Sequence, residues 1–201
     1  GVYTTSGHIQ DSTEVHISGG TIGGGVYGAY AEQSGNVTEN SILIEDDLSI
    51  IGGTTINSAY GAYTDLGNAI DNSIVVKSGT VGNAYSGYSA LGDVWENVFT
   101  FDGGTLNSIA AGYTVLGESW GNLVNLTADT GTINGDVSGG YSVSAGGVAR
   151  ENQVVIDFGG TSNGMISGGR SDFGDTRGNT VILQSGNVSG ITGGRSDHGR
   201  T

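Results

Sequence analysis

A pattern of one glycine, preceded four or five residues earlier by a tyrosine or an arginine, recurs eight times and constrains the fold more than any other feature. The tyrosine or arginine is always followed by Ser, Thr or Ala. The steps between these glycines are 25 to 32 residues. Units of this length cannot bury their own apolar face, so a period in this range predicts a stack of repeats. The predicted column is Tyr3, Tyr30, Tyr63, Tyr88, Tyr113, Tyr141, Arg170 and Arg195.

The first half of each unit reads as a β-strand with one buried face. An asparagine is followed by apolar residues two and four places on, as in Asn72, Ile74 and Val76, and this period of two is typical of a strand. A glycine corner and one or two further short strands follow. Side-chain amides carry both donor and acceptor, so stacked asparagines are expected to form a hydrogen-bonded ladder. The ladder residues are Asn40, Asn72, Asn97, Asn122, Asn152 and Asn179, with Thr13 in the first full unit.

These features predict an all-β, right-handed parallel β-helix of roughly eight coils. Propeller blades need about 40 to 50 residues, so these units are too short for a propeller. Neither terminal unit looks like a polar cap, and we therefore expect a single solenoid segment, 1–201, that is an internal window of a longer rod. Residues 46–51 are expected to be an insertion between two strands. The predicted units are 8–35, 36–67, 68–92, 93–117, 118–146, 147–174 and 175–199.

Composition excludes several classes of function. The formal charge is −14, and nucleic acids and anionic membranes call for a basic surface. The chain has no cysteine, which rules out disulfides and thiol chemistry. No apolar run is long enough for a membrane-spanning helix, so no direct membrane insertion by this segment is expected. The 40 glycines occur without proline but with regularly placed apolar residues, which indicates a folded repeat protein rather than a disordered one.

The repeats resemble those of a known group. Runs such as the one from Asn72 to Val81, and the Gly-Gly-Tyr-Ser and Gly-Gly-Arg-Ser sequences that begin at Gly139 and Gly168, are similar to the glycine-rich repeats of bacterial autotransporter passenger domains. The resemblance covers essentially the whole chain. It implies a β-helix exported across the outer membrane to the surface of a Gram-negative bacterium. Passengers on this scaffold include adhesins, aggregation factors and proteases, so the resemblance does not fix the function.

The sequence gives few signs of catalysis, and no cofactor or metal site is expected. The histidines lie at 8, 16 and 198, and no nucleophile elbow is present. Glu39, Asp71 and Glu96 directly precede ladder asparagines, and on successive coils they would lie near one another. Three interpretations remain open for these carboxylates: a solvated corner, a cation site, or a catalytic pair. Partial matches to calcium-binding nonapeptides near Asp172 and Asp175 have the wrong period.

The tyrosine and arginine column is the main candidate for a binding surface. If Ser89 and its equivalents point inward, the period of two turns Tyr88 and its equivalents outward. The column would then be either a strip for a ligand or partner, or a self-stacked structural element. Glycines beside it leave the direction of the side chains open.

We expect a non-enzymatic segment of a secreted bacterial surface adhesin. It would mediate attachment or self-association through its repetitive surface, and its partners would be host surface glycans or proteins, or other copies of itself. The alternatives are a structural stalk with no ligand of its own, and a β-helix that processes or binds polysaccharide.

Overall fold

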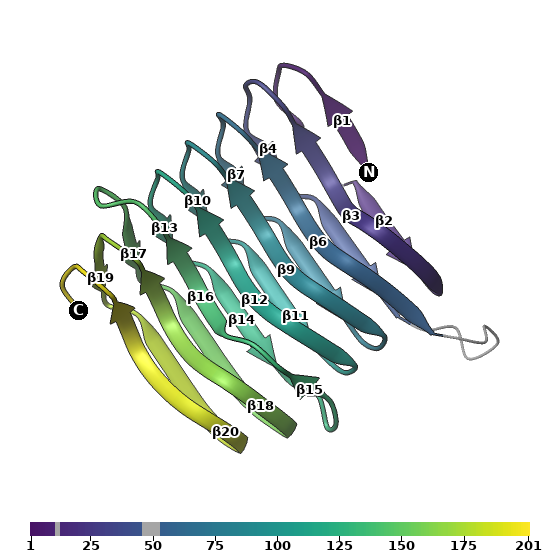
Figure 1. The fold of residues 1–201 in the computed structure, drawn as a ribbon. Coiled ribbons are helices and arrows are strands. Elements are labelled where there is room, and N and C mark those ends of the chain that lie inside the picture. The colour runs from purple at the N-terminus through teal and green to yellow at the C-terminus, as the bar shows by residue number, and fades with distance from the viewer. Residues whose placement is uncertain (11–12, 46–52) are drawn as a thin grey trace.

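The computed structural model of the chain is a parallel β-helix of about seven turns, with no helix in the part that it describes, residues 1–10, 13–45 and 53–201. The coils stack along one axis, and the two termini lie at opposite ends of the rod (Figure 1). The predicted fold class is confirmed. The count of roughly eight coils was slightly high, because the first residues supply only the end of one coil, β1 (Val2–Thr4). The insertion predicted at 46–51 lies outside the described residues.

The coils form two parallel sheets, of 14 and six strands, in the described part of the chain. Short strands after the corner glycine form the six-stranded sheet: β4 (Val37–Thr38), β7 (Ala69–Ile70), β10 (Val94–Trp95), β13 (Ser119–Trp120), β17 (Val148–Arg150) and β19 (Asp175–Arg177). The strand that follows the ladder position comes next in each coil: β2 (Glu14–Ile17), β5 (Ser41–Ile44), β8 (Ser73–Val76), β11 (Val98–Phe101) and β14 (Leu123–Leu126).

Longer strands complete the 14-stranded sheet and form the broad face turned to the viewer in Figure 1. They are β3 (Gly20–Ala31), β6 (Thr54–Thr64), β9 (Thr80–Ser89) and β12 (Thr105–Thr114), and in the next coil β15 (Thr132–Ile133) and β16 (Val137–Ser142). In the last two coils, β18 (Gln153–Ser171) and β20 (Thr180–Ser196) run through both halves without a break. Equivalent residues pair in register, for example Tyr63 with Tyr88 and Tyr88 with Tyr113.

Apolar columns fill the interior, as the period of two predicts. Ile74, Val76, Phe99 and Phe101 are fully buried, and each lies over its equivalent in the next coil. The last coil differs: Leu183 is 48% exposed, because β20 pairs with β18 on one side only. No helix in the described part of the chain is long and apolar enough to cross a membrane.

The asparagine column is buried from Asn40 to Asn152, half-buried at Asn179, and forms a continuous ladder. The backbone N–H of Asn72 donates to Asn97 Oδ1 at 3.0 Å, and the Asn72 amide nitrogen donates to the same oxygen at 3.0 Å. The same two bonds join each of the other neighbouring asparagines, from Asn40 to Asn179. Thr13 joins the ladder by donating to Asn40 Oδ1 at 2.8 Å. These side chains therefore hold the stack together and are not available to a ligand.

Candidate functional site

The residue after each column tyrosine from Tyr30 to Tyr141 is buried, and where it is Ser or Thr its hydroxyl bonds to an adjoining corner glycine. Ser89 Oγ donates to the carbonyl of Gly67, one coil earlier, at 2.7 Å, and accepts from the N–H of Gly92 at 2.8 Å. Thr114 makes the equivalent bonds to Gly92 and Gly117. Each hydroxyl thus joins two corner glycines on successive coils, which accounts for the recurrence of these residue types. Because Ser89 points inward, Tyr88 points outward.

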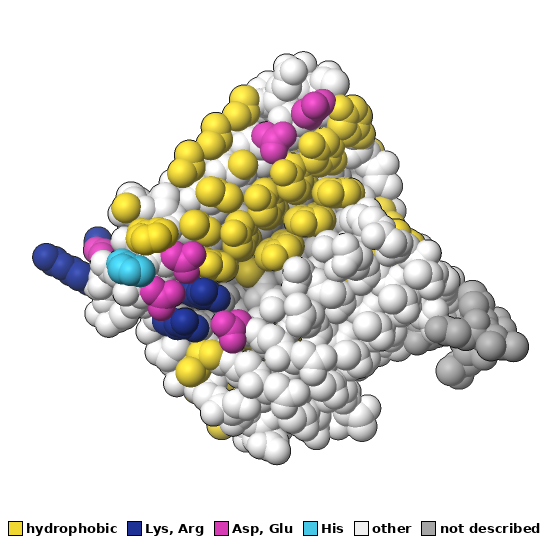
Figure 2. Space-filling view, viewed as in Figure 1, with side chains coloured by type: hydrophobic (Ala, Val, Ile, Leu, Met, Phe, Trp, Pro, Cys, Tyr) yellow, Lys and Arg dark blue, Asp and Glu magenta, His cyan; other side chains and the backbone are white. Residues whose placement is uncertain are grey.

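Eight tyrosines lie on the outer side of the long strands and Tyr3 lies beside them on β1, and we call this surface the tyrosine face. It has two columns: the predicted one, and a second, shorter one that the repeats also show, three residues earlier in the coil. The first holds Tyr3, Tyr30, Tyr63, Tyr88, Tyr113 and Tyr141, and the second holds Tyr27, Tyr60 and Tyr85. Hydrophobic side chains accordingly gather on the face formed by these strands (Figure 2).

A change in the strand alternation brings the second column onto the same face. Tyr85 and Tyr88 are three residues apart, which in a regular strand would place them on opposite sides. Ser86 and Gly87, between them, are both buried: Ser86 Oγ donates to the carbonyl of Val98, and Gly87 packs against the Asn97 amide. The strand bends over the ladder there, and so both tyrosines face outward.

Most rings stack along each column and meet edge to face between columns, while Tyr113 and Tyr141 meet edge to face within the first column at 4.9 Å and 79°. Tyr63 and Tyr88 have ring centroids 4.6 Å apart with planes 7° apart, and Tyr88 and Tyr113 are 5.1 Å apart. Tyr60 meets Tyr88 across the columns at 5.8 Å and 89°. Both arrangements are favourable for aromatic pairs. The face therefore combines internal packing with an accessible aromatic surface, since most of these rings are only partly buried.

Burial raises the pKa of several phenols on this face. It raises the pKa of Tyr85 to about 12, with the neighbouring phenols of Tyr60 and Tyr113 adding to the effect. It also raises the pKa of Tyr63 and Tyr141, each of which lies beside an aspartate. Because phenols ordinarily ionise only near about pH 10, the tyrosine face at neutral pH is a surface of rings and uncharged hydroxyl groups.

Arginines continue the first column in the last two coils. The Arg170 guanidinium lies 4.5 Å from the centroid of the Tyr141 ring, an arrangement suited to a cation–π contact. It is also paired with Asp136 at 3.3 Å and with Asp172 at 3.4 Å. Arg195 pairs with Asp136 at 3.6 Å and with Asp197 at 3.2 Å. The positive charges at this end are therefore balanced by aspartates.

Two further surface columns were not singled out from the sequence. Leu66, Leu91 and Leu116, each directly before a corner glycine, are 51%, 49% and 53% exposed. On the six-stranded sheet, Trp95 and Trp120 stack at 5.3 Å, and Arg150 lies 5.0 Å from the Trp120 ring. The leucines could have been found from their fixed offset to the glycine, and the tryptophans from their fixed offset to the asparagine.

The carboxylates that precede the ladder lie on exposed corners, which accords with the solvated-corner interpretation. Glu39, Asp71 and Glu96 all have left-handed backbone conformations, with φ of 61°, 56° and 58°. Gly121 and Gly178 occupy the same corner with φ of 64° and 60°. The position is thus defined by its backbone conformation, which glycine adopts without strain. The described residues contain no group of three or more acidic or histidine side chains that could hold a metal ion.

The three histidines are separated and have local partners. His8 Nδ1 accepts from the N–H of Asn36, His16 lies 2.8 Å from Glu45, and His198 stacks on Phe173.

Comparison with protein families, curated proteins and solved structures gave no match. The function must therefore be argued from the geometry of the surface.

Proposed function

We propose that the chain is a non-enzymatic segment of a bacterial surface adhesin that attaches, or self-associates, through the tyrosine face. The observation that carries this proposal is the double column of outward, partly exposed tyrosines on one side of the rod. Tyrosine is enriched at interfaces because its ring packs against a partner while its hydroxyl forms hydrogen bonds. The partner would be a host glycan or protein, or a second rod.

Regular spacing supports a multivalent role. Register on one coil sets register on all coils, so a repetitive partner can engage several rungs at once and gain avidity without any new kind of contact. The likeness of the repeats to autotransporter passengers supports export to the bacterial surface. A formal charge of −14 supports a surface that repels non-specific anionic contacts.

A structural stalk is the second candidate, and the stacking of the tyrosines on one another favours it. In that case the stacked rings would stabilise the packing of successive coils, and no partner would be needed.

Replacing Tyr63, Tyr88 and Tyr113 with serine separates the two candidates. We expect attachment or clumping to fall by about tenfold or more, because central aromatic residues carry most of the binding energy of an interface. The β circular dichroism should persist, since the ladder and the apolar core are untouched. The matched control replaces Ile70, Trp95 and Trp120 with serine, three outward positions of the six-stranded sheet on successive coils. Unchanged attachment, or loss of the fold, would favour the stalk.

A further inference from the structure

The second tyrosine column stops half-way along the rod. Tyr60 pairs with Tyr85 of the next coil, but the residues that follow at this position in the next two coils are Ala110 and Ser138. Ring centroids in this column are 5.3 Å apart at Tyr60 and Tyr85. The next ring would lie over Ala110, where no ring exists. The first column continues beside this gap through Tyr113 and Tyr141.

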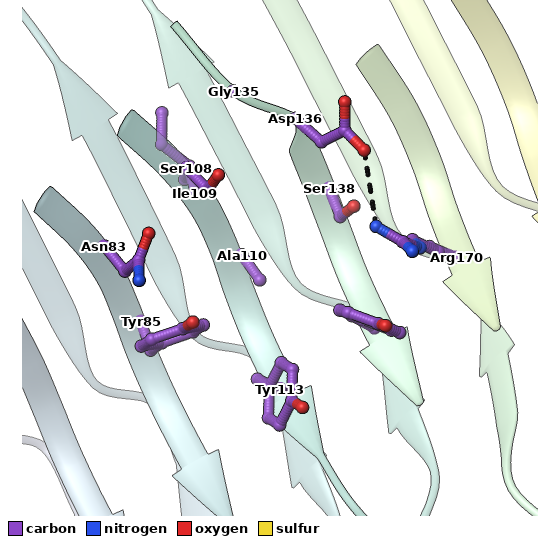
Figure 3. A pocket seen from close by; sticks show the side chains of 11 residues that line it. Asn83, Tyr85, Ser108, Ile109, Ala110, Tyr113, Gly135, Asp136, Ser138 and Arg170 are labelled. Atoms are coloured by element: carbon purple, nitrogen blue, oxygen red, sulfur yellow. Dashed lines mark hydrogen bonds and ion pairs between the residues drawn. The ribbon is translucent and has the colours of Figure 1, made fainter. Parts of the chain in front are cut away.

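A hollow of about 450 Å³ lies at the end of the column (Figure 3). Tyr85 and Tyr113 form an aromatic corner beside it, with ring centroids 5.2 Å apart and planes 67° apart. Ala110 and Ser138 lie in its lining, and Asp136 and Arg170 lie at its far side, joined to each other. The volume falls within the range of about 300–1,000 Å³ that is usual for ligand sites.

Polar groups around the hollow are free to bind a ligand. No described residue forms a hydrogen bond with the hydroxyl of Ser108 or of Ser138. Asn83 uses its Oδ1 to accept from Asn107, while its Nδ2 has no partner among the described residues. An apolar or aromatic side chain placed here would leave these groups unpaired, which is costly where water is excluded. A ring bearing several hydroxyl groups would instead pair with them.

The two charged side chains that line the hollow, Asp136 and Arg170, neutralise each other. The carboxylate of Asp136 is shared by Arg170 and Arg195, and Arg170 is also paired with Asp172. An anionic ligand would find no unmatched cation, and a cationic ligand would find no unmatched carboxylate. The Asp136–Arg170 pair still offers an acceptor beside a donor, an arrangement that suits two neighbouring hydroxyl groups.

We propose that this hollow is a subsite for one pyranose ring of a neutral saccharide. The ring would stack on Tyr85 and take the place of the missing tyrosine over Ala110. Its hydroxyl groups would bond to Ser108, Ser138 and the Asp136–Arg170 pair. The inference deepens the proposed function, since the subsite belongs to the same face, yet it depends on the gap in the column rather than on the column itself.

Ala110→Tyr tests the proposal by filling the hollow with the ring that the column lacks. The fold should persist, since tyrosine already stands at this register in the three preceding tyrosine-bearing coils. The probes are neutral glucose-, galactose- and mannose-based oligosaccharides, measured by saturation-transfer NMR and on a glycan array. Sialylated oligosaccharides and a tyrosine-rich peptide are measured alongside. Tyr27→Ser, at the far end of the second column, is the matched control, and Tyr85→Ala removes the wall of the hollow.

We expect the native chain and Tyr27→Ser to bind at least one neutral oligosaccharide, and Ala110→Tyr and Tyr85→Ala to bind it about tenfold or more weakly. Absence of binding to every neutral probe, equal binding by Ala110→Tyr, or binding of only the sialylated sugars or only the peptide would each overturn the proposal. Attachment that survives in Ala110→Tyr while sugar binding is lost would leave the proposed function standing.

Discussion

At the scale of single residues, the buried asparagines are the most demanding positions. Asn97 donates to Asn122 Oδ1 and to the carbonyls of Ala69 and Trp95, and it accepts two bonds from Asn72. Each amide thus forms hydrogen bonds within its own coil and to both neighbouring coils. A buried group that loses its partner costs more than the bond itself contributes, because it has also lost its water.

Asn97→Ala should therefore lower the free energy of unfolding by about 3 kcal/mol, because it strands several buried groups at once. Denaturant unfolding followed by circular dichroism measures this change. The control is Asn107→Ala, an exposed amide 3.1 Å from Asn83 Oδ1, which should change stability by less than about 0.5 kcal/mol. Equal effects of the two substitutions would contradict a structural role for the ladder.

At the scale of elements, the long strands couple the inward hydroxyls to the outward tyrosines. The hydroxyl of Ser89 fixes the corner, and the bend at Ser86 and Gly87 sets the direction of Tyr85. Burial of these rings ties the stability of the strands to the protonation of the phenols. A phenol whose pKa is raised by folding favours the folded state while it stays protonated.

Stability should be fully kept below about pH 10, where phenols of the unfolded chain titrate, and should be lost as the pH rises through the pKa of about 12 at Tyr85. An alkaline titration of tyrosinate absorbance, followed together with circular dichroism, tests this. The Tyr85→Phe variant should lose less stability over the same range. Titration of all the tyrosines near about pH 10 in a chain that keeps its fold would contradict the packing described.

The sequence carries enough information to predict the coil but not the whole surface. Period two and the asparagine column predicted the apolar core and the buried position of Asn72, because both follow from strand geometry. The sequence left the direction of Tyr88 open, and it gave no sign that Tyr85 shares that face, because the bend at Gly87 depends on packing against Asn97. The missing tyrosine at Ala110 is visible in the aligned repeats. The hollow beside it could not be predicted, because side chains of neighbouring coils form its walls.

At the scale of the whole molecule, the rod has a direction. Aromatic columns on both sheets give way to arginines toward the C-terminal end: Tyr141 is followed by Arg170, and Trp120 by Arg150. In each case the arginine lies over the last ring of its column. The long-strand face therefore presents an aromatic stretch, then the hollow, and then a charge-balanced edge. A partner that binds along the rod would meet these in a fixed order.

The most direct test of the tyrosine face is chemical footprinting of rods that are free, attached to cells, or associated with one another. Tyrosine and tryptophan modification is read by mass spectrometry. We predict that Tyr88 and Tyr113 become protected on attachment or association, while Trp95 and Trp120 on the six-stranded sheet react as in the free rod. Protection of the tryptophans, with the tyrosines unchanged, would contradict the assignment of the tyrosine face as the contact surface.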